Sequence, residues 1–116
     1  MSVSDRVLTL DVAHPPMQPE ALEQELQDAL SRVRVSPSLR LLKIVHGYGS
    51  SGRGGSTKAT VENWAYRERN RVRSVIAGES YGLFDETTRR MRAEVGHYQD
   101  ADLDAGNRGI TLVWVK

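Results

Sequence analysis

The chain has 116 residues, the size of one compact domain, and its apolar (39%) and charged (27%) fractions are typical of a soluble globular protein. No apolar run reaches the roughly 18 residues of a membrane helix, and the N-terminal segment lacks the apolar core and cleavage site of a signal peptide. Cysteine is absent, which excludes disulfides, thiolate catalysis and thiolate metal sites. We therefore expect a cytoplasmic protein with no membrane partner.

Charge is unevenly distributed along the chain, although the net charge is only +1. Residues 43–73 carry seven cationic and two anionic side chains, a net charge of +5. Residues 79–104 carry three cationic and seven anionic side chains, a net charge of −4. A basic middle beside an acidic segment indicates a polyanionic partner. A solvated helix face rich in arginine is the alternative interpretation.

The first half of the chain predicts a strand, a helix and a second strand. Residues 6–12 alternate apolar and polar side chains, which predicts a strand, and the adjacent prolines that follow end it. Residues 19–34 begin with proline and repeat apolar side chains every three or four positions, which predicts an amphipathic helix. Residues 39–45 are apolar enough for a central strand, and a glycine-rich loop follows them.

The second half continues the alternation. Residues 56–70 predict a helix capped by Ser56 or Thr57. Residues 72–78 and 110–116 predict two further strands, the last of them antiparallel. The order β-α-β-α-β-(α)-β, in a single domain spanning residues 1–116, predicts a two-layer α/β sandwich with a four-stranded mixed sheet. Right-handed crossovers place both long helices on one face of that sheet.

An extended connection, residues 78–105, separates the third strand from the last one. Its first part predicts a short helix anchored by Leu83 or Phe84, and a polar loop follows this helix. Three roles are open: the connection covers the core, screens a site or binds a protein partner. A structural role is the default, because long loops often only complete a fold.

The glycine-rich loop resembles two nucleotide-binding motifs. Gly47 to Gly52 match G-x-G-x-x-G after a strand and before a helix. A dinucleotide-binding domain needs more strands than this chain supplies, and Glu79 lies too far along the chain to bind the ribose. The phosphate-binding P-loop needs lysine and a hydroxyl where Arg53 and Gly54 stand. A small-nucleotide binder is therefore disfavoured.

Asp11, His14 and His46 suggest a different site. The first two lie at the end of the first strand, and His46 ends the second. If these strands are parallel neighbours, their carboxyl ends meet at the edge where open α/β sheets place their sites. A carboxylate, imidazoles and a glycine nest suit a phosphodiester. Each residue also has an ordinary structural interpretation: a turn cap, a surface loop residue or a strand-end hydrogen bond.

Three stretches together resemble a known family. These are LDVAH (residues 10–14), HGYG (residues 46–49) and GNRGITLVWV (residues 106–115). With this pattern, the chain resembles the Smr, or small MutS-related, domain in its stand-alone form. The resemblance implies a fold similar to the C-terminal domain of translation initiation factor three, nucleic-acid binding, and endonuclease activity on DNA or RNA. Ala13 stands where the family has histidine, and His14 follows one place later.

By the resemblance, Asp11 takes the position of the family aspartate and His46 that of the H-G-x-G histidine. His46 is expected to act as general acid or base, and Asp11 to orient it or to recruit a metal-bound water. His14 is the third candidate. No metal site is predicted, and Mg or Mn stays open as a cofactor. If the displaced histidine is needed, the chain is instead a non-catalytic, structure-selective binding module in repair or translation quality control.

The predicted nucleic-acid-binding residues surround the glycine loop and extend along the second helix. Arg53 and Lys58 are expected to pair with phosphates. Tyr48 stacks on a base or covers the loop's glycines, two uses that suit tyrosine equally. The complete predicted set is Gly47, Tyr48, Gly49, Ser50, Arg53, Gly54, Lys58, Arg67, Arg71, Asn107 and Arg108.

Overall fold

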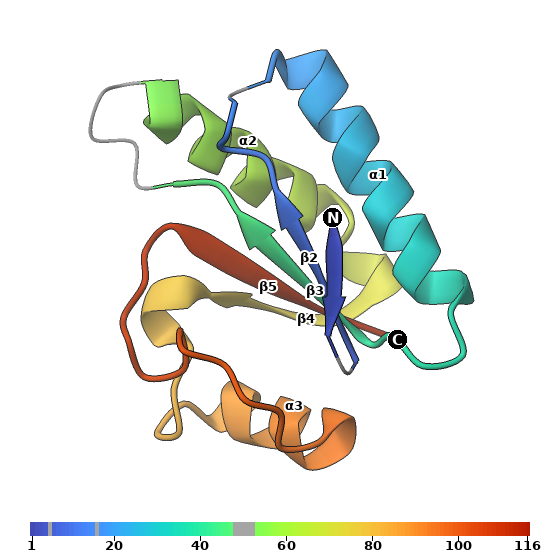
Figure 1. The fold of residues 1–116 in the computed structure, drawn as a ribbon, viewed down its shortest axis with the longest axis vertical. Coiled ribbons are helices and arrows are strands. Elements are labelled where there is room, and N and C mark those ends of the chain that lie inside the picture. The colour runs from blue at the N-terminus through green and yellow to red at the C-terminus, as the bar shows by residue number, and fades with distance from the viewer. Residues whose placement is uncertain (5, 16, 48–52) are drawn as a thin grey trace.

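The computed structural model describes residues 1–4, 6–15, 17–47 and 53–116. Strands and helices alternate through most of the chain (Figure 1). The elements are β1 (Ser2–Ser4), β2 (Val7–Asp11), α1 (Pro19–Val35), β3 (Leu41–Val45), α2 (Arg53–Arg67), the 3-10 helix η1 (Arg69–Arg71), β4 (Val72–Ala77), the 3-10 helix η2 (Gly78–Ser80), α3 (Glu86–Val95) and β5 (Ile110–Val115).

One mixed sheet organises the described residues, with strand order β1-β2-β3-β5-β4. β2 and β3 are parallel, and β5 is antiparallel to both β3 and β4, as expected for the last strand. The sheet has five strands instead of the predicted four, because β1 pairs with β2. No sequence pattern marks β1, because its three residues, Ser-Val-Ser, are too few to show an alternation.

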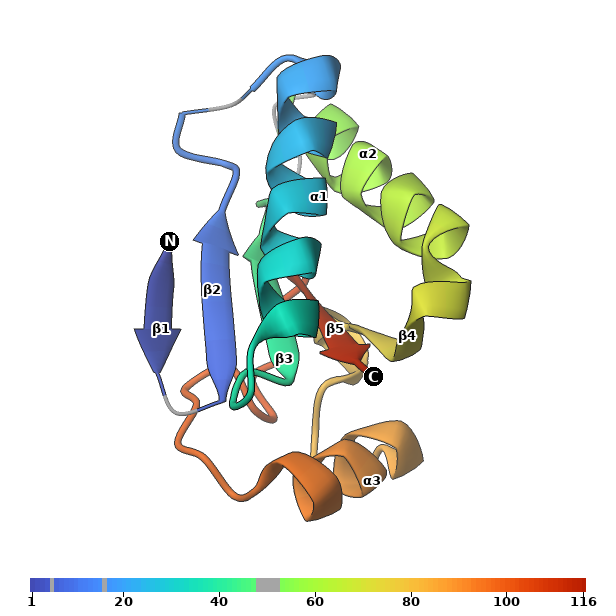
Figure 2. The same cartoon turned by 90° about the vertical axis from the view of Figure 1, so that its right-hand side faces the viewer.

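The directions of the strands define two edges of the sheet. β2, β3 and β4 run in the same direction, because β5 is antiparallel to both β3 and β4. They all end at one edge, with Asp11, Val45 and Ala77, which we call the carboxyl edge. They all begin at the opposite edge, which we call the amino edge. α1 and α2 begin near the carboxyl edge and run back toward the amino edge (Figure 2).

α1 and α2 cover the same face of the sheet, as predicted (Figure 2). Side chains from both helices pack against alternate residues of the strands in one apolar cluster. Its fully buried members include Leu26 of α1, Trp64 of α2, and Leu8 and Ile44 of the sheet. The apolar side chains whose spacing predicted the two helices therefore face the core.

The opposite face is also covered, so the fold has three layers instead of the predicted two. α3 and the connection around it pack on this face (Figure 1). Met91, Val95 and Tyr81 form its apolar cluster with strand residues. The predicted anchors are wrong: Leu83 is exposed, and Phe84 is 96% exposed. The connection therefore completes the core, which was the default interpretation.

A cation on the sheet orders the polar loop that precedes β5. Lys43 of β3 forms ion pairs with Asp100 (2.8 Å) and Asp102 (2.5 Å). Burial alone would lower the pKa of Lys43, but its bonds to the two carboxylates raise it overall. Burial would likewise raise the pKa of Asp102, but bonds from Lys43 and Asn107 lower it. Part of the uneven charge along the sequence is therefore neutralised inside the fold.

No helix in the described part of the chain is long and apolar enough to cross a membrane.

Candidate nucleic-acid interface

Asp11 and His14 form an exposed pair at the carboxyl edge. His14 Nδ1 lies 3.0 Å from Asp11 Oδ2, and the amides of Ala13 and His14 donate to Asp11 Oδ1 at 2.8 and 3.2 Å. Partial burial would raise the pKa of Asp11, but these hydrogen bonds and the neighbouring imidazole lower it overall. Asp11 is therefore a carboxylate at neutral pH, and it holds one ring nitrogen of His14. The His14 side chain is 78% exposed.

His46 lies in the interior. It is fully buried, with Nε2 2.9 Å from Thr111 Oγ1 and Nδ1 2.9 Å from the carbonyl oxygen of Gly47. Burial lowers the pKa of His46, although its hydrogen bond with Gly47 opposes that shift. A neutral imidazole with both nitrogens bonded ties the end of β3 to β5. In this arrangement both ring nitrogens are engaged within the protein.

The sheet separates Asp11 from His46. Asp11 is paired in register with Val45, so those two side chains lie on the same face, the face covered by α3. His46 follows Val45, and its ring bonds Thr111 on the face covered by α2. The structure therefore joins Asp11 to His14 and leaves His46 bonded elsewhere. Of the two candidate histidines, His14 is the one that reaches the carboxylate.

The glycine loop begins beside the Asp11–His14 pair. Gly47 has a φ of +82°, which favours glycine, and a β-carbon placed there would lie 3.8 Å from that of Ala13. Tyr48, Gly49 and Ser50 lie outside the described residues. Arg53 and Gly54 are the first two residues of α2, and the Arg53 side chain lies outside the described part of the structure. The nearness of Gly47 to Ala13 still places the start of the loop at the predicted edge.

Lys58 and Asn107 are engaged within the protein. Lys58 Nζ donates to the carbonyl oxygen of Arg108 at 3.0 Å and lies 3.8 Å from Glu79, with its side chain only 17% exposed. Asn107 bonds Asp102 and the amide of Gly109. Both residues fix the turn before β5 at the carboxyl edge. The Arg108 side chain is exposed there.

Arg67 and Arg71 do not join that site. Arg67 is the last residue of α2 and Arg71 lies beyond it, at the far end of a 15-residue helix that is roughly 22 Å long. Arg67 forms an ion pair with Glu23 of α1, and Arg71 lies 3.7 Å from Glu68. Two of the predicted phosphate contacts are therefore at or near the amino edge, away from the Asp11–His14 pair.

No metal-binding cluster is found among the described residues, where no group of three or more His, Asp or Glu side chains could hold an ion. Asp11 and His14 supply two candidate ligands. The sequence prediction named no metal site, with Mg or Mn left open.

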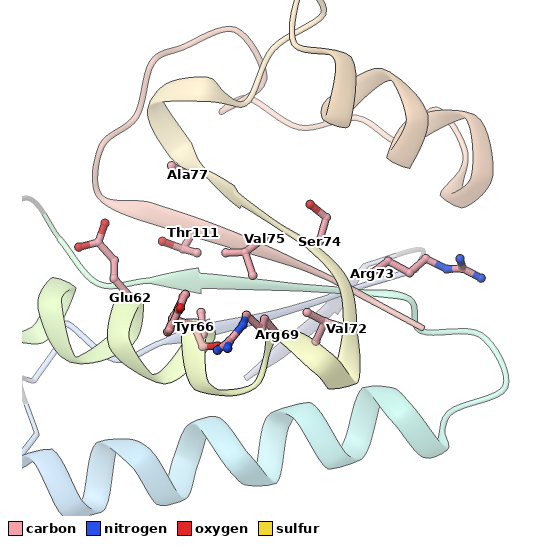
Figure 3. A pocket seen from close by; sticks show the side chains of 10 residues that line it. Glu62, Tyr66, Arg69, Val72, Arg73, Ser74, Val75, Ala77 and Thr111 are labelled. Carbon is pink, nitrogen blue, oxygen red and sulfur yellow. The ribbon is translucent and has the colours of Figure 1, made fainter.

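A groove that the sequence did not predict lies between α2 and the outer strand β4 (Figure 3). Its volume is about 460 Å³. Glu62 and Tyr66 project from α2, while Val75 and Thr111 lie on the strands (Figure 3). It exists because α2 packs over the inner strands and leaves Val75 of β4 partly exposed. Apolar periodicity marks buried faces, so it gives no signal for such a groove.

Comparisons of the chain with protein-family models, curated proteins and solved structures find no match.

Proposed function

We propose that this chain is a nucleic-acid-binding domain of the Smr kind that cleaves phosphodiester bonds at its carboxyl edge. One observation carries the proposal: the exposed Asp11–His14 pair stands at the end of β2, beside the start of the glycine loop. The pair resembles the carboxylate–imidazole unit of general acid–base catalysis. Its place agrees with the rule that open α/β sheets bind ligands at the carboxyl ends of parallel strands.

In the proposed chemistry, His14 is the catalytic residue and Asp11 orients it. Asp11 holds Nδ1 of the ring at 3.0 Å, which leaves Nε2 for the substrate. As a base, Nε2 removes a proton from the attacking hydroxyl, either water or a ribose 2′-hydroxyl. The Asp11 carboxylate stabilises the imidazolium that results. The attacking oxygen bonds to phosphorus, the bond from phosphorus to the leaving oxygen breaks, and the imidazolium returns its proton to that oxygen. A positioned imidazole of this kind contributes roughly 10²–10⁴-fold to rate.

His46 takes a positioning role in this proposal. Its ring bonds both Thr111 of β5 and the carbonyl of Gly47, the first residue of the glycine loop after β3. It thereby fixes where the loop leaves the sheet. Backbone amides of such a loop, with the N-terminus of α2, are suited to hold a phosphate.

A binding module without catalysis is the second candidate, and the Lys58 contacts favour it. Lys58 already bonds the Arg108 carbonyl and Glu79. A lysine committed to the protein is less able to stabilise charge on a reacting phosphate. Such a domain would hold branched or single-stranded nucleic acid for a partner in repair or translation quality control.

The two candidates differ in a cleavage assay. The purified chain is incubated with end-labelled RNA, single-stranded DNA, duplex DNA and branched DNA, in magnesium, in manganese and in chelator. Cleavage is expected, with about a 100-fold lower rate for His14→Ala and Asp11→Asn. His97→Ala is the matched control, because His97 is an exposed histidine outside the proposed site.

Binding without cleavage of any substrate would leave only the binding module. An equal loss of rate in His97→Ala would contradict the assignment of His14. A folded His46→Gln variant that loses as much activity as His14→Ala, with unchanged binding, would return the catalytic role to His46.

A further inference from the structure

Cations gather at the amino edge of the sheet, opposite the proposed cleavage site. Eight of the chain's 16 lysines and arginines lie there. They come from the ends of two helices and of four strands (Figure 2). The eight are Arg6, Arg32, Arg34, Arg40, Arg69, Arg71, Arg73 and Lys116.

Four of these cations form what we call the basic row: Arg6, Arg40, Lys116 and Arg71. Each directly precedes or follows one strand, in the order β2, β3, β5 and β4. Hydrogen bonds link their backbones across the sheet: the Arg40 amide donates to Arg6, and the Val115 amide to Arg40, both at 2.9 Å. With neighbouring strands about 4.8 Å apart, the row is roughly 14 Å long.

Helix ends explain only some of this charge. Arg32 and Arg34 occupy the last turn of α1, where cations offset the helix dipole. The basic row has a different origin, because it follows the edge of the sheet. Among the described residues, ion pairs connect the eight cations to two carboxylates, Glu68 (3.7 Å from Arg71) and Glu94 (3.3 Å from Arg73). Arg40 and Lys116 also donate to backbone carbonyls, those of Ser36 and Leu39 and that of Asn70, but these neutral acceptors leave their charge uncompensated. The amino edge therefore keeps a surplus of positive charge.

The groove between α2 and β4 starts at this basic edge. Its lining runs from Val72, the first residue of β4, to Ala77, the last. Tyr66 is 66% exposed on its helical wall, with the Arg69 guanidinium 4.0 Å from the ring centroid. Figure 3 shows Tyr66 and Arg69 together on this wall. An exposed aromatic ring beside cations suits a nucleobase, which stacks on such rings.

We propose that the amino edge is a binding surface for single-stranded nucleic acid, with phosphates along the basic row and a base against Tyr66 in the groove. Arginine predominates in the patch, and its planar guanidinium binds phosphate oxygens in pairs. A single strand can place an unpaired base in the groove, whereas a duplex keeps its bases stacked. The inference rests on the proposed nucleic-acid substrate and is independent of the Asp11–His14 chemistry.

Fluorescence anisotropy with a labelled 15-nucleotide oligo(U) and a duplex of equal length tests the surface. In Arg6→Gln/Arg71→Gln, affinity for the single strand falls about tenfold, and the salt dependence of log K falls by about 1.4, as expected for two lost phosphate contacts. Arg89→Gln/Arg90→Gln is the matched control, because it removes the same charge from exposed positions on α3. An equal loss in the control, or no loss in the row variant, would overturn the proposal.

Tyr66→Ala tests the groove. Its affinity for oligo(U) falls about fivefold to tenfold, whereas Tyr66→Phe keeps the affinity because it keeps the ring. Duplex affinity stays unchanged in both variants. If Tyr66→Ala binds oligo(U) like the unmodified chain, or weakens duplex binding equally, the groove holds no base and the proposal fails.

Two further measurements separate this proposal from its alternatives. A row variant that binds phosphatidylserine vesicles more weakly, but oligo(U) as before, would assign the surface to an anionic membrane and overturn the inference. Asp11→Asn/His14→Ala is expected to bind oligo(U) through the row even where no cleavage is observed. If no cleavage is observed but oligo(U) still binds, the cleavage proposal fails and the proposed binding surface stands. If the row variant cleaves and binds oligo(U) normally, the binding surface is refuted and the cleavage proposal stands.

Discussion

The two faces of the sheet are stabilised by different interactions. Against α1 and α2, the core is a continuous apolar cluster that includes Leu8, Leu26 and Trp64. Against α3, an apolar cluster is bordered by a polar network in which Lys43 and Tyr81 meet Asp100. The first face needs only side chains of suitable size and polarity. The second depends on specific partners that come from distant parts of the chain.

This difference makes the second face sensitive to pH. Asp102 has a lowered pKa and Lys43 a raised one, so the pair stabilises the fold when both are charged. The Asp102 contribution is present above its unfolded pKa of about 3.9 and is lost as pH falls through the lower folded value. The Lys43 contribution is present below about 10.4 and is lost as pH rises through the higher folded value.

Lys43→Met is expected to have the largest effect. It leaves Asp100 buried without its cation, which destabilises the fold by about 3–5 kcal/mol at pH 7. Urea unfolding at several pH values measures the effect. The difference from the unmodified chain is largest near neutrality and shrinks as pH falls through the lowered folded pKa of Asp102, where protonation removes its ion pair with Lys43.

Leu26→Ala is the matched control on the other face. It removes a fully buried side chain at a cost of about 2–5 kcal/mol, by a mechanism without titration. Its difference from the unmodified chain is constant between pH 4 and 9. The triple variant Lys43→Met/Asp100→Asn/Asp102→Asn should regain part of the stability that Lys43→Met loses. A pH-independent loss in Lys43→Met would show that packing, and not charge, explains its effect.

His46→Gln tests a buried polar group on the α1–α2 face, with a smaller expected effect. Loss of the ring weakens the bonds to Thr111 and Gly47 and costs about 1–2 kcal/mol at pH 8. Burial lowers the folded pKa of His46, so the unfolded chain binds the proton more tightly. The stability of the unmodified chain therefore falls as pH drops below about 6.5 toward the folded pKa.

The expected result is that the difference between His46→Gln and the unmodified chain narrows from pH 8 to pH 5. Thermal unfolding monitored by circular dichroism at these two values measures it. Thr111→Val, which removes the hydroxyl bonded to His46 but keeps the histidine, is the control and should retain the pH dependence. A constant difference for His46→Gln would mean that folding does not shift the pKa of His46.

Most of the fold can be predicted from the sequence because apolar periodicity marks the longer helices and strands. α1 and the four longer strands lie where their patterns place them, and β1 is too short to have a pattern. α2 begins at Arg53, so the predicted caps Ser56 and Thr57 lie inside the helix. The third layer was missed for a physical reason. Lys43, Asp100 and Tyr98 are polar in the sequence, and they become core neighbours only when the chain brings them together. Periodicity within one segment cannot report such long-range pairing.

The candidate site was predictable only in its location. Strand ends brought Asp11, His14 and Gly47 to one edge, as expected. Side-chain direction was not predictable, because it depends on register and on the turn after β2. His14 folds back to Asp11, while His46 faces β5. The basic row did have a signal in the sequence: a cation adjoins each of four predicted strands at the same end.

Substitution of Phe84 is expected to have the smallest effect on stability, and it tests the difference between the two faces directly. Apolar pattern alone named it as an anchor for the third layer, yet its side chain is 96% exposed. Phe84→Ala should therefore change the free energy of unfolding by less than about 0.5 kcal/mol. Met91→Ala, on the buried side of α3, should cost about 2–5 kcal/mol. If Phe84→Ala destabilised the fold as much as Met91→Ala in the same urea titration, Phe84 would pack against the domain in solution. The α3 face would then depend on apolar packing as much as the α1–α2 face does. The ion pairs of Lys43 would be the remaining difference between the two faces.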